Sequence, residues 1–82
     1  MNQHDLKITP EYFDDIVSDI KTFEVRRNDR DFKVGDILRL MEYFPSDNSY
    51  SGEDVYATVK CIFDHPMYVK DGYVIMSIKL ND

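Results

Sequence analysis

Cysteine is nearly absent from this 82-residue chain, which contains only Cys61. One cysteine cannot form an internal disulfide bond, so a reducing cytoplasm is the expected compartment. No apolar run approaches the roughly 18–20 residues of a membrane span, and the N-terminus lacks the pattern of a signal peptide. His4 and His65 match no Cys/His spacing of a metal site, so neither a metal nor another cofactor is expected.

Positive charge is also scarce. The chain has 10 lysines and arginines against 16 aspartates and glutamates, which gives a formal charge of -6. This balance argues against a protein that coats duplex nucleic acid through diffuse positive charge, but it does not exclude a local cationic pocket. No internal repeat or low-complexity segment interrupts the sequence. Residues 1–82 are therefore expected to form a single domain with a small core.

Hydrophobic periodicity predicts one helix and five strands. Alternation over residues 4–8 predicts a short strand, and Thr9-Pro10 is typical of the start of a helix that runs to about residue 20. Further strands are predicted from Thr22 to residue 26 and over 37–44, 55–63 and 74–80, with a long hairpin loop at 45–52. The fold class is therefore α+β, mainly β: a small barrel of about five strands with one N-terminal helix.

The apolar positions within these elements identify the expected core. The predicted helix has one stripe of apolar residues at helical spacing. In the predicted strand over 55–63, every second residue is apolar, and Cys61 is one of these, so it is expected to be an inert core residue. Aromatic side chains near the N-terminus are expected in the core as well. The stripe and these aromatics comprise Tyr12, Phe13, Ile16, Val17, Ile20 and Phe23.

Cationic residues gather in one segment, because six of the ten lie between Lys21 and Arg39. Glu24 and Arg26 are two residues apart on a predicted strand and share a face, whereas Phe23 and Val25 are expected to face the core. With Lys21 beside that strand, a cleft would hold two cations, which suit phosphate, and one carboxylate, which accepts from the amino group of a base.

The candidate ligand-binding site extends into the next loop. At least one of Asn28 and Arg30 is expected to line the same pocket, and no residue is assigned a catalytic role. The complete candidate set is Lys21, Glu24, Arg26, Arg27, Asn28, Asp29 and Arg30.

Several segments carry a family resemblance. These are HDLKITPEYFDDI (residues 4–16), KTFEVRRNDRDFKVGDIL (residues 21–38) and Gly72-Tyr73-Val74. Lys21, Glu24 and Arg26 match the motif G-x-K-x-x-E-x-R, with Asp19 in place of its glycine. The chain thereby resembles the ASCH (activating signal cointegrator homology) superfamily, and more closely a small bacterial and phage subfamily of unknown function. The resemblance implies a PUA-like β-barrel with a cleft that binds RNA or nucleotide-like ligands.

Two other functions stay open. Some small ASCH relatives resemble amidohydrolases that act on acylated nucleosides, with a lysine and a threonine in the cleft. Here Glu24 occupies the threonine position, so the interpretation favours a binding module over an enzyme. The third function is that of an acidic protein-interaction or nucleic-acid-mimic protein.

Each site feature also has a purely structural interpretation. Glu24 and Arg26 would then form an exposed salt bridge, which contributes only about 0–1 kcal/mol to stability. Residues 28–31 would form a loop whose side chains cap its own backbone. Lys21 would be an ordinary cation at the C-terminal end of the helix.

Overall fold

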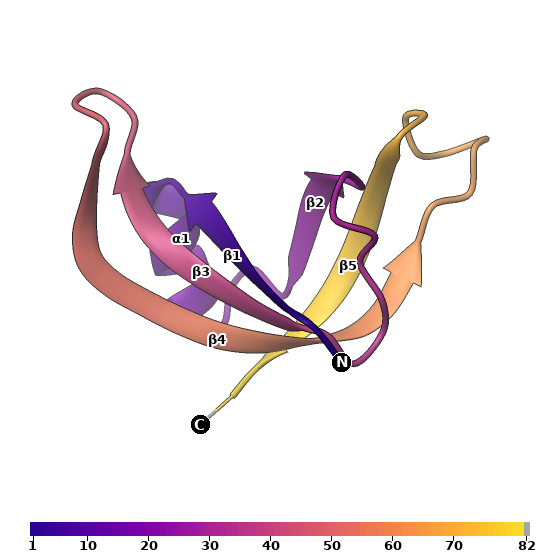
Figure 1. The fold of residues 1–82 in the computed structure, drawn as a ribbon, viewed down its shortest axis with the longest axis horizontal. Helices are drawn as coiled ribbons and strands as arrows, with labels where there is room; N and C mark the ends of the chain where they lie inside the picture. Colours follow the sequence, from indigo (N-terminus) through magenta and orange to yellow (C-terminus); the bar gives the residue numbers. More distant parts are fainter. Residues whose placement is uncertain (82) are drawn as a thin grey trace.

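The computed structural model describes residues 1–81 as a five-stranded sheet with one short helix (Figure 1). The predicted fold class is confirmed, because the chain is mainly β and barrel-like. The N-terminal helix is the only helix among the described residues. In chain order the elements are β1 (Gln3–Ile8), α1 (Pro10–Val17), β2 (Phe23–Arg27), β3 (Ile37–Phe44), β4 (Ser49–Phe63) and β5 (Tyr73–Leu80).

The sheet curls into a half-barrel whose two edge strands face each other. The strand order is β1-β3-β4-β5-β2, in which β1 runs parallel to β3 and every other pair is antiparallel. β4 is the long central strand, and it pairs with β3 along its first part and with β5 along its second. Figure 1 shows β1 and β2 on opposite sides of the open mouth.

Helix α1 begins where the sequence predicts but ends earlier than residue 20. Pro10 occupies the first turn, where its missing N–H costs nothing, after the extended backbone of Thr9. Asp19 has a φ of 63°, the left-handed conformation that ends helices. The ASCH motif has glycine at this position, and Asp tolerates the conformation better than most residues.

The core fills the concave side of the sheet. It is built from Leu6, Ile8, Phe13, Ile16, Phe32, Leu38, Leu40, Ala57, Val59, Val74, Met76 and Ile78. Of the predicted helical stripe only Phe13 and Ile16 are buried. Ile20 lies beyond the early end of the helix and is exposed, and Val17, the last residue of α1, is exposed as well. The prediction that Tyr12 belongs to the core is also wrong, since this side chain is exposed at the helix surface.

A bulge in β4 overturns one further expectation. The pairing with β5 shifts between Val59 and Cys61, so the alternation of faces changes there. Val59 is fully buried, whereas Cys61 is exposed and Ile62 packs against the core in its place. The prediction of a buried Cys61 is therefore wrong.

Candidate functional site

Strand β2 turns its charged residues inward. Its register with β5 sets Glu24 opposite Met76 and Arg26 opposite Val74, and both of these partners are buried. Directly paired residues lie on the same face of a sheet, so Glu24 and Arg26 lie on the concave side. Phe23 and Val25, at 45% and 51% exposure, lie on the outside. The prediction that Phe23 and Val25 face the core is wrong.

The inward orientation is tolerated because three charged groups satisfy one another. Lys21 Nζ donates to Glu24 Oε1 at 2.6 Å, and Arg26 Nε donates to Glu24 Oε2 at 2.8 Å. The Glu24 side chain is only 3% exposed, and each of its two oxygens has a cationic partner. A buried carboxylate with both oxygens paired avoids the penalty that an isolated buried charge carries. This arrangement differs from an exposed salt bridge.

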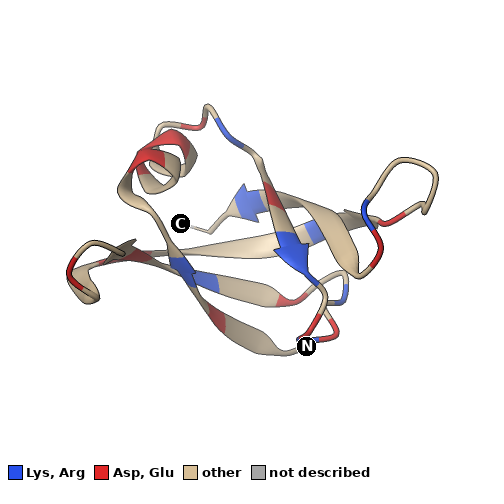
Figure 2. Cartoon of the chain, turned by 90° about the horizontal axis from the view of Figure 1, so that it is seen from above, with Lys and Arg blue, Asp and Glu red and all other residues tan. Residues whose placement is uncertain are grey.

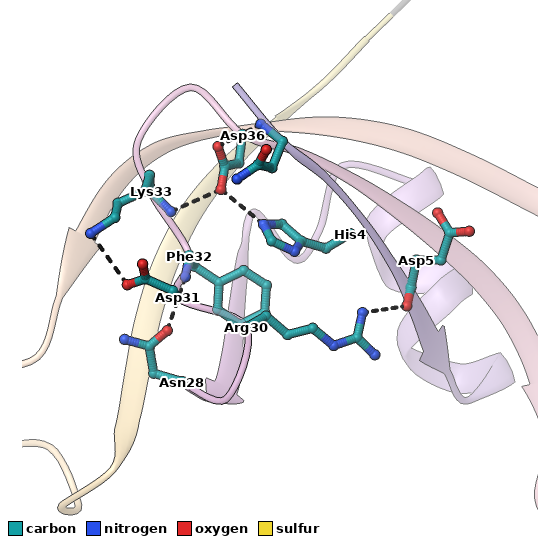
Figure 3. A network of polar contacts seen from close by, with 9 residues as sticks. His4, Asp5, Asn28, Arg30, Asp31, Phe32, Lys33 and Asp36 are labelled. Atoms are coloured by element: carbon teal, nitrogen blue, oxygen red, sulfur yellow. Dashed lines mark hydrogen bonds and ion pairs between the residues drawn. The ribbon is translucent and has the colours of Figure 1, made fainter.

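Arginine side chains also cover the free edge of β1. The Ile37 amide donates to the Asn2 carbonyl, so the alternation of a parallel ladder points the carbonyls of Asp5 and Lys7 away from β3. Arg26 Nη2 donates to the Lys7 carbonyl at 2.8 Å. Arg30 Nη1 donates to the Asp5 carbonyl at 2.9 Å (Figure 3). These bonds link the two sides of the half-barrel and satisfy an edge that would otherwise be open to pairing.

A cleft of about 440 Å³ lies between the two edge strands. This volume is within the usual range of small-molecule sites. The Thr9 hydroxyl oxygen is buried and, among residues 1–81, has no hydrogen-bond partner, because Thr9 begins the helix without capping it through its side chain. The cleft is lined by Lys7, Ile8, Thr9, Tyr12, Lys21, Phe23, Glu24, Val25 and Arg26.

The structure brings only three of the seven predicted site residues together. Lys21, Glu24 and Arg26 line the cleft, whereas neither Asn28 nor Arg30 does. β2 ends at Arg27, and the chain then leaves the cleft in a loop that leads to β3.

The four remaining candidates have separate surroundings. The guanidinium of Arg27 lies 5.6 Å from the centre of the Tyr73 ring, and Asp29 is exposed. Asn28 Oδ1 accepts from the Phe32 amide at 3.0 Å, which is the loop-capping role that the structural interpretation expected. Arg30 is held by the Asp5 carbonyl.

A buried histidine–aspartate pair, which the sequence did not reveal, anchors this loop. His4 Nε2 lies 2.8 Å from Asp36 Oδ2, and the amides of Asn2 and Lys33 donate to the same carboxylate (Figure 3). Burial would raise the pKa of Asp36, but the hydrogen bonds from Asn2, His4 and Lys33 outweigh it and lower that pKa. The pair ties the start of β3 to β1 and thereby helps to hold Arg30 in place. The sequence features that belong to this pair are His4, within the predicted first strand, and Asp36, directly after Gly35.

One family model matches almost the whole chain. The family described as domain of unknown function (DUF3850) matches residues 3–78, which include every residue of the cleft. No curated protein matches the chain. Within residues 1–81, α1 has eight residues, and no helix has the length and apolar character needed to cross a membrane.

Proposed function

The chain belongs to the DUF3850 family, and we propose that it is a binding module whose cleft holds RNA or a nucleotide-like anion. The observation that carries this proposal is the convergence of Lys21, Glu24 and Arg26 on one cleft of suitable size. The resemblance of these three residues to the ASCH motif supports the same function.

The two cations keep donors that their internal bonds do not use. Arg26 has five N–H groups, of which the Nε group binds Glu24 and one Nη2 group binds Lys7. Lys21 has three, and it donates to Glu24 and to the Phe23 carbonyl. The remaining donors are available to a phosphate or carboxylate, and two cations against one anion leave the triad with one net positive charge.

Neutral groups in the cleft suit a nucleobase. The Ile78 amide donates to the Thr22 carbonyl, so the backbone groups of Val25 point away from β5, toward the open edge. These backbone groups offer a donor and an acceptor without charge, and Thr9, whose hydroxyl has no partner among residues 1–81, lines the same cleft. Tyr12 and Phe23 place exposed rings at the same cleft, and aromatic rings stack on bases.

A cytoplasmic location is part of this proposal. Cys61 is free and exposed, and reducing conditions would keep its thiol unpaired.

The geometry favours binding over catalysis. Lys21 Nζ donates to Glu24 and to the Phe23 carbonyl, so it is already engaged as a hydrogen-bond donor and is not poised to attack a substrate. Thr22 does not line the cleft, and Glu24 has both oxygens engaged.

The proposal is tested by titrating the protein with uridine and cytidine monophosphate and with short RNAs at low salt. Arg26→Ala should weaken binding by roughly 1.5–3 kcal/mol, the range for a hydrogen bond to a charged group, and added salt should weaken it further. Arg39→Ala is the matched control, because Arg39 also donates its Nε group to a carboxylate but lies outside the cleft.

Three results would overturn this proposal. One is equal affinity of the Arg26→Ala and Arg39→Ala variants for the anion. Another is no affinity of the wild-type protein for any of these anions at low salt, which would favour a protein partner. The third is hydrolysis of N-acylated cytidines that Lys21→Ala abolishes, which would identify the protein as an amidohydrolase.

A further inference from the structure

The outer face of the sheet exposes apolar and aromatic side chains where β2, β5 and β4 lie side by side. The register places Val25, Ile75 and Phe63 in one row across the three strands. Phe23 lies in the adjacent row, and Tyr73 lies opposite Arg27 in the row on the other side. We call this surface the outer platform: Phe23, Val25, Arg27, Phe63, Tyr73 and Ile75. Exposed apolar surfaces of this kind, framed by charged residues, often mark interaction sites.

The charge of the outer platform is opposite to that of the whole chain. Among the described residues, the outward positions of β2, of β5 and of β4 from Thr58 onward include no carboxylate, although they include Arg27, Lys60 and Lys79. The two carboxylates near the platform, Asp64 and Asp71, lie in the loop between β4 and β5, beside Lys70. Two cations lie over one ring, because Arg27 is 5.6 Å and Lys70 Nζ is 5.3 Å from the centre of Tyr73. Acidic residues gather elsewhere, notably on α1 (Figure 2).

We propose that the outer platform binds a single-stranded oligonucleotide, whose bases stack on its aromatic rings while its phosphates meet the surrounding cations. Aromatic side chains on a sheet face, combined with a positive surface, are the means by which many proteins hold single-stranded nucleic acid. Strands lie about 4.8 Å apart, so three strands span roughly 10 Å, enough for about two or three stacked bases.

This inference rests on the proposed function and extends it from a nucleotide to a strand. Phe23 and Val25 border both the cleft and the outer platform, so a strand with one nucleotide in the cleft can continue around the edge of β2. Charge also selects the occupant. A second copy of this chain would bring like cations together on the two platforms, whereas a polyphosphate chain neutralises them.

Cys61 offers a direct reporter, because it is the chain's only cysteine, is exposed, and lies in the same row as Phe23. The experiment measures the rate of Cys61 alkylation by iodoacetamide, using the wild-type protein with octauridylate or with uridine monophosphate at saturation. Octauridylate should slow alkylation about fivefold or more by covering the platform, and the mononucleotide should leave the rate nearly unchanged.

A second measurement uses affinity. Phe63→Ala should weaken octauridylate binding roughly tenfold, within the range for loss of one stacked base, and should leave the affinity for uridine monophosphate unchanged. Tyr50→Ala is the control, because Tyr50 is an equally exposed ring on the hairpin between β3 and β4.

The outcomes separate the two proposals. One outcome is that Arg26→Ala weakens octauridylate binding, while octauridylate leaves the rate of Cys61 alkylation unchanged and Phe63→Ala leaves the affinity unchanged. In that case the cleft proposal stands and the platform proposal is overturned. If octauridylate protects Cys61 and binding ignores Arg26→Ala, the platform stands and the cleft proposal fails. Protection that grows with protein concentration in the absence of RNA would identify a second copy as the occupant and overturn the inference.

Discussion

Replacing Glu24 by glutamine should destabilise the protein much more than removing an exposed carboxylate. Glutamine keeps the shape of the side chain and one acceptor oxygen, but it turns an N–H group toward a cation that also donates. Hydrogen bonds to charged groups contribute about 1.5–3 kcal/mol each. Lys21 and Arg26 are 16% and 24% exposed, so they can turn partly to water and recover some of this loss.

We therefore expect Glu24→Gln to lower the free energy of unfolding by about 2–3 kcal/mol, which for a domain of this size lowers Tm by roughly 10–20 °C. Urea and thermal unfolding, followed by circular dichroism, measure both quantities. The matched control is Asp54→Asn, because Asp54 accepts from Arg39 at 2.7 Å in a more exposed ion pair, where water screens the charges. Equal stability losses in the two variants would refute the idea that burial makes the Glu24 triad special.

Three further variants test other parts of the structure. Asp36→Asn should lower the free energy of unfolding by about 2–3 kcal/mol at neutral pH, because an amide cannot accept from three donors as the carboxylate does. Since folding lowers the pKa of Asp36, the carboxylate contributes its full stability above the ordinary pKa of 3.8, and this contribution is lost as the pH falls below that value. The free energies of unfolding of the wild-type protein and of Asp36→Asn should therefore converge in acid, and a difference that stays constant with pH would contradict this. Thr9→Val should leave the free protein as stable or slightly more stable, because the hydroxyl has no partner among residues 1–81, yet should weaken nucleotide binding; a large loss of stability would reveal a structural role. Asp19→Gly should raise the free energy of unfolding by about 0.5 kcal/mol, because glycine adopts the left-handed backbone conformation of this position without strain. A lower free energy of unfolding in chemical denaturation would show that the Asp19 side chain stabilises the turn.

Local pattern predicted β3 and β5 well because period-two alternation is a property of each strand by itself. The prediction of a hairpin loop at 45–52 and a strand from residue 55 is wrong, because β4 already begins at Ser49 and continues the pairing with β3. β3 spans Ile37–Phe44 as predicted, and β5 begins one residue before the predicted start. The helix was overestimated because Ile20 continues the helical spacing although Asp19 has already turned the chain. The bulge in β4 lies beyond local pattern as well, since it is a feature of pairing with β5.

Three of the seven candidate residues, Lys21, Glu24 and Arg26, line one cleft, but the orientation of their strand was not predicted. Alternation shows that Glu24 and Arg26 share a face, but it does not show which face of β2 is inside. By pattern alone the apolar Phe23 and Val25 are the natural core residues, whereas burial of Glu24 depends on Lys21, which precedes β2, and on Arg26 in the same strand. Arg30 could not be assigned from spacing, because its role depends on the carbonyl of Asp5, 25 residues earlier.

The most direct test of the cleft is an NMR titration of the isotope-labelled protein with uridine monophosphate at low salt, followed through backbone amide shifts. Binding in the cleft should move the amides of Val25, Ile8 and Thr9 in a saturable manner, and added salt should reverse the shifts. The amides of the hairpin between β3 and β4, on the far side of β1, should stay in place. Shifts confined to that hairpin, or none at millimolar ligand, would contradict nucleotide binding between the two edge strands.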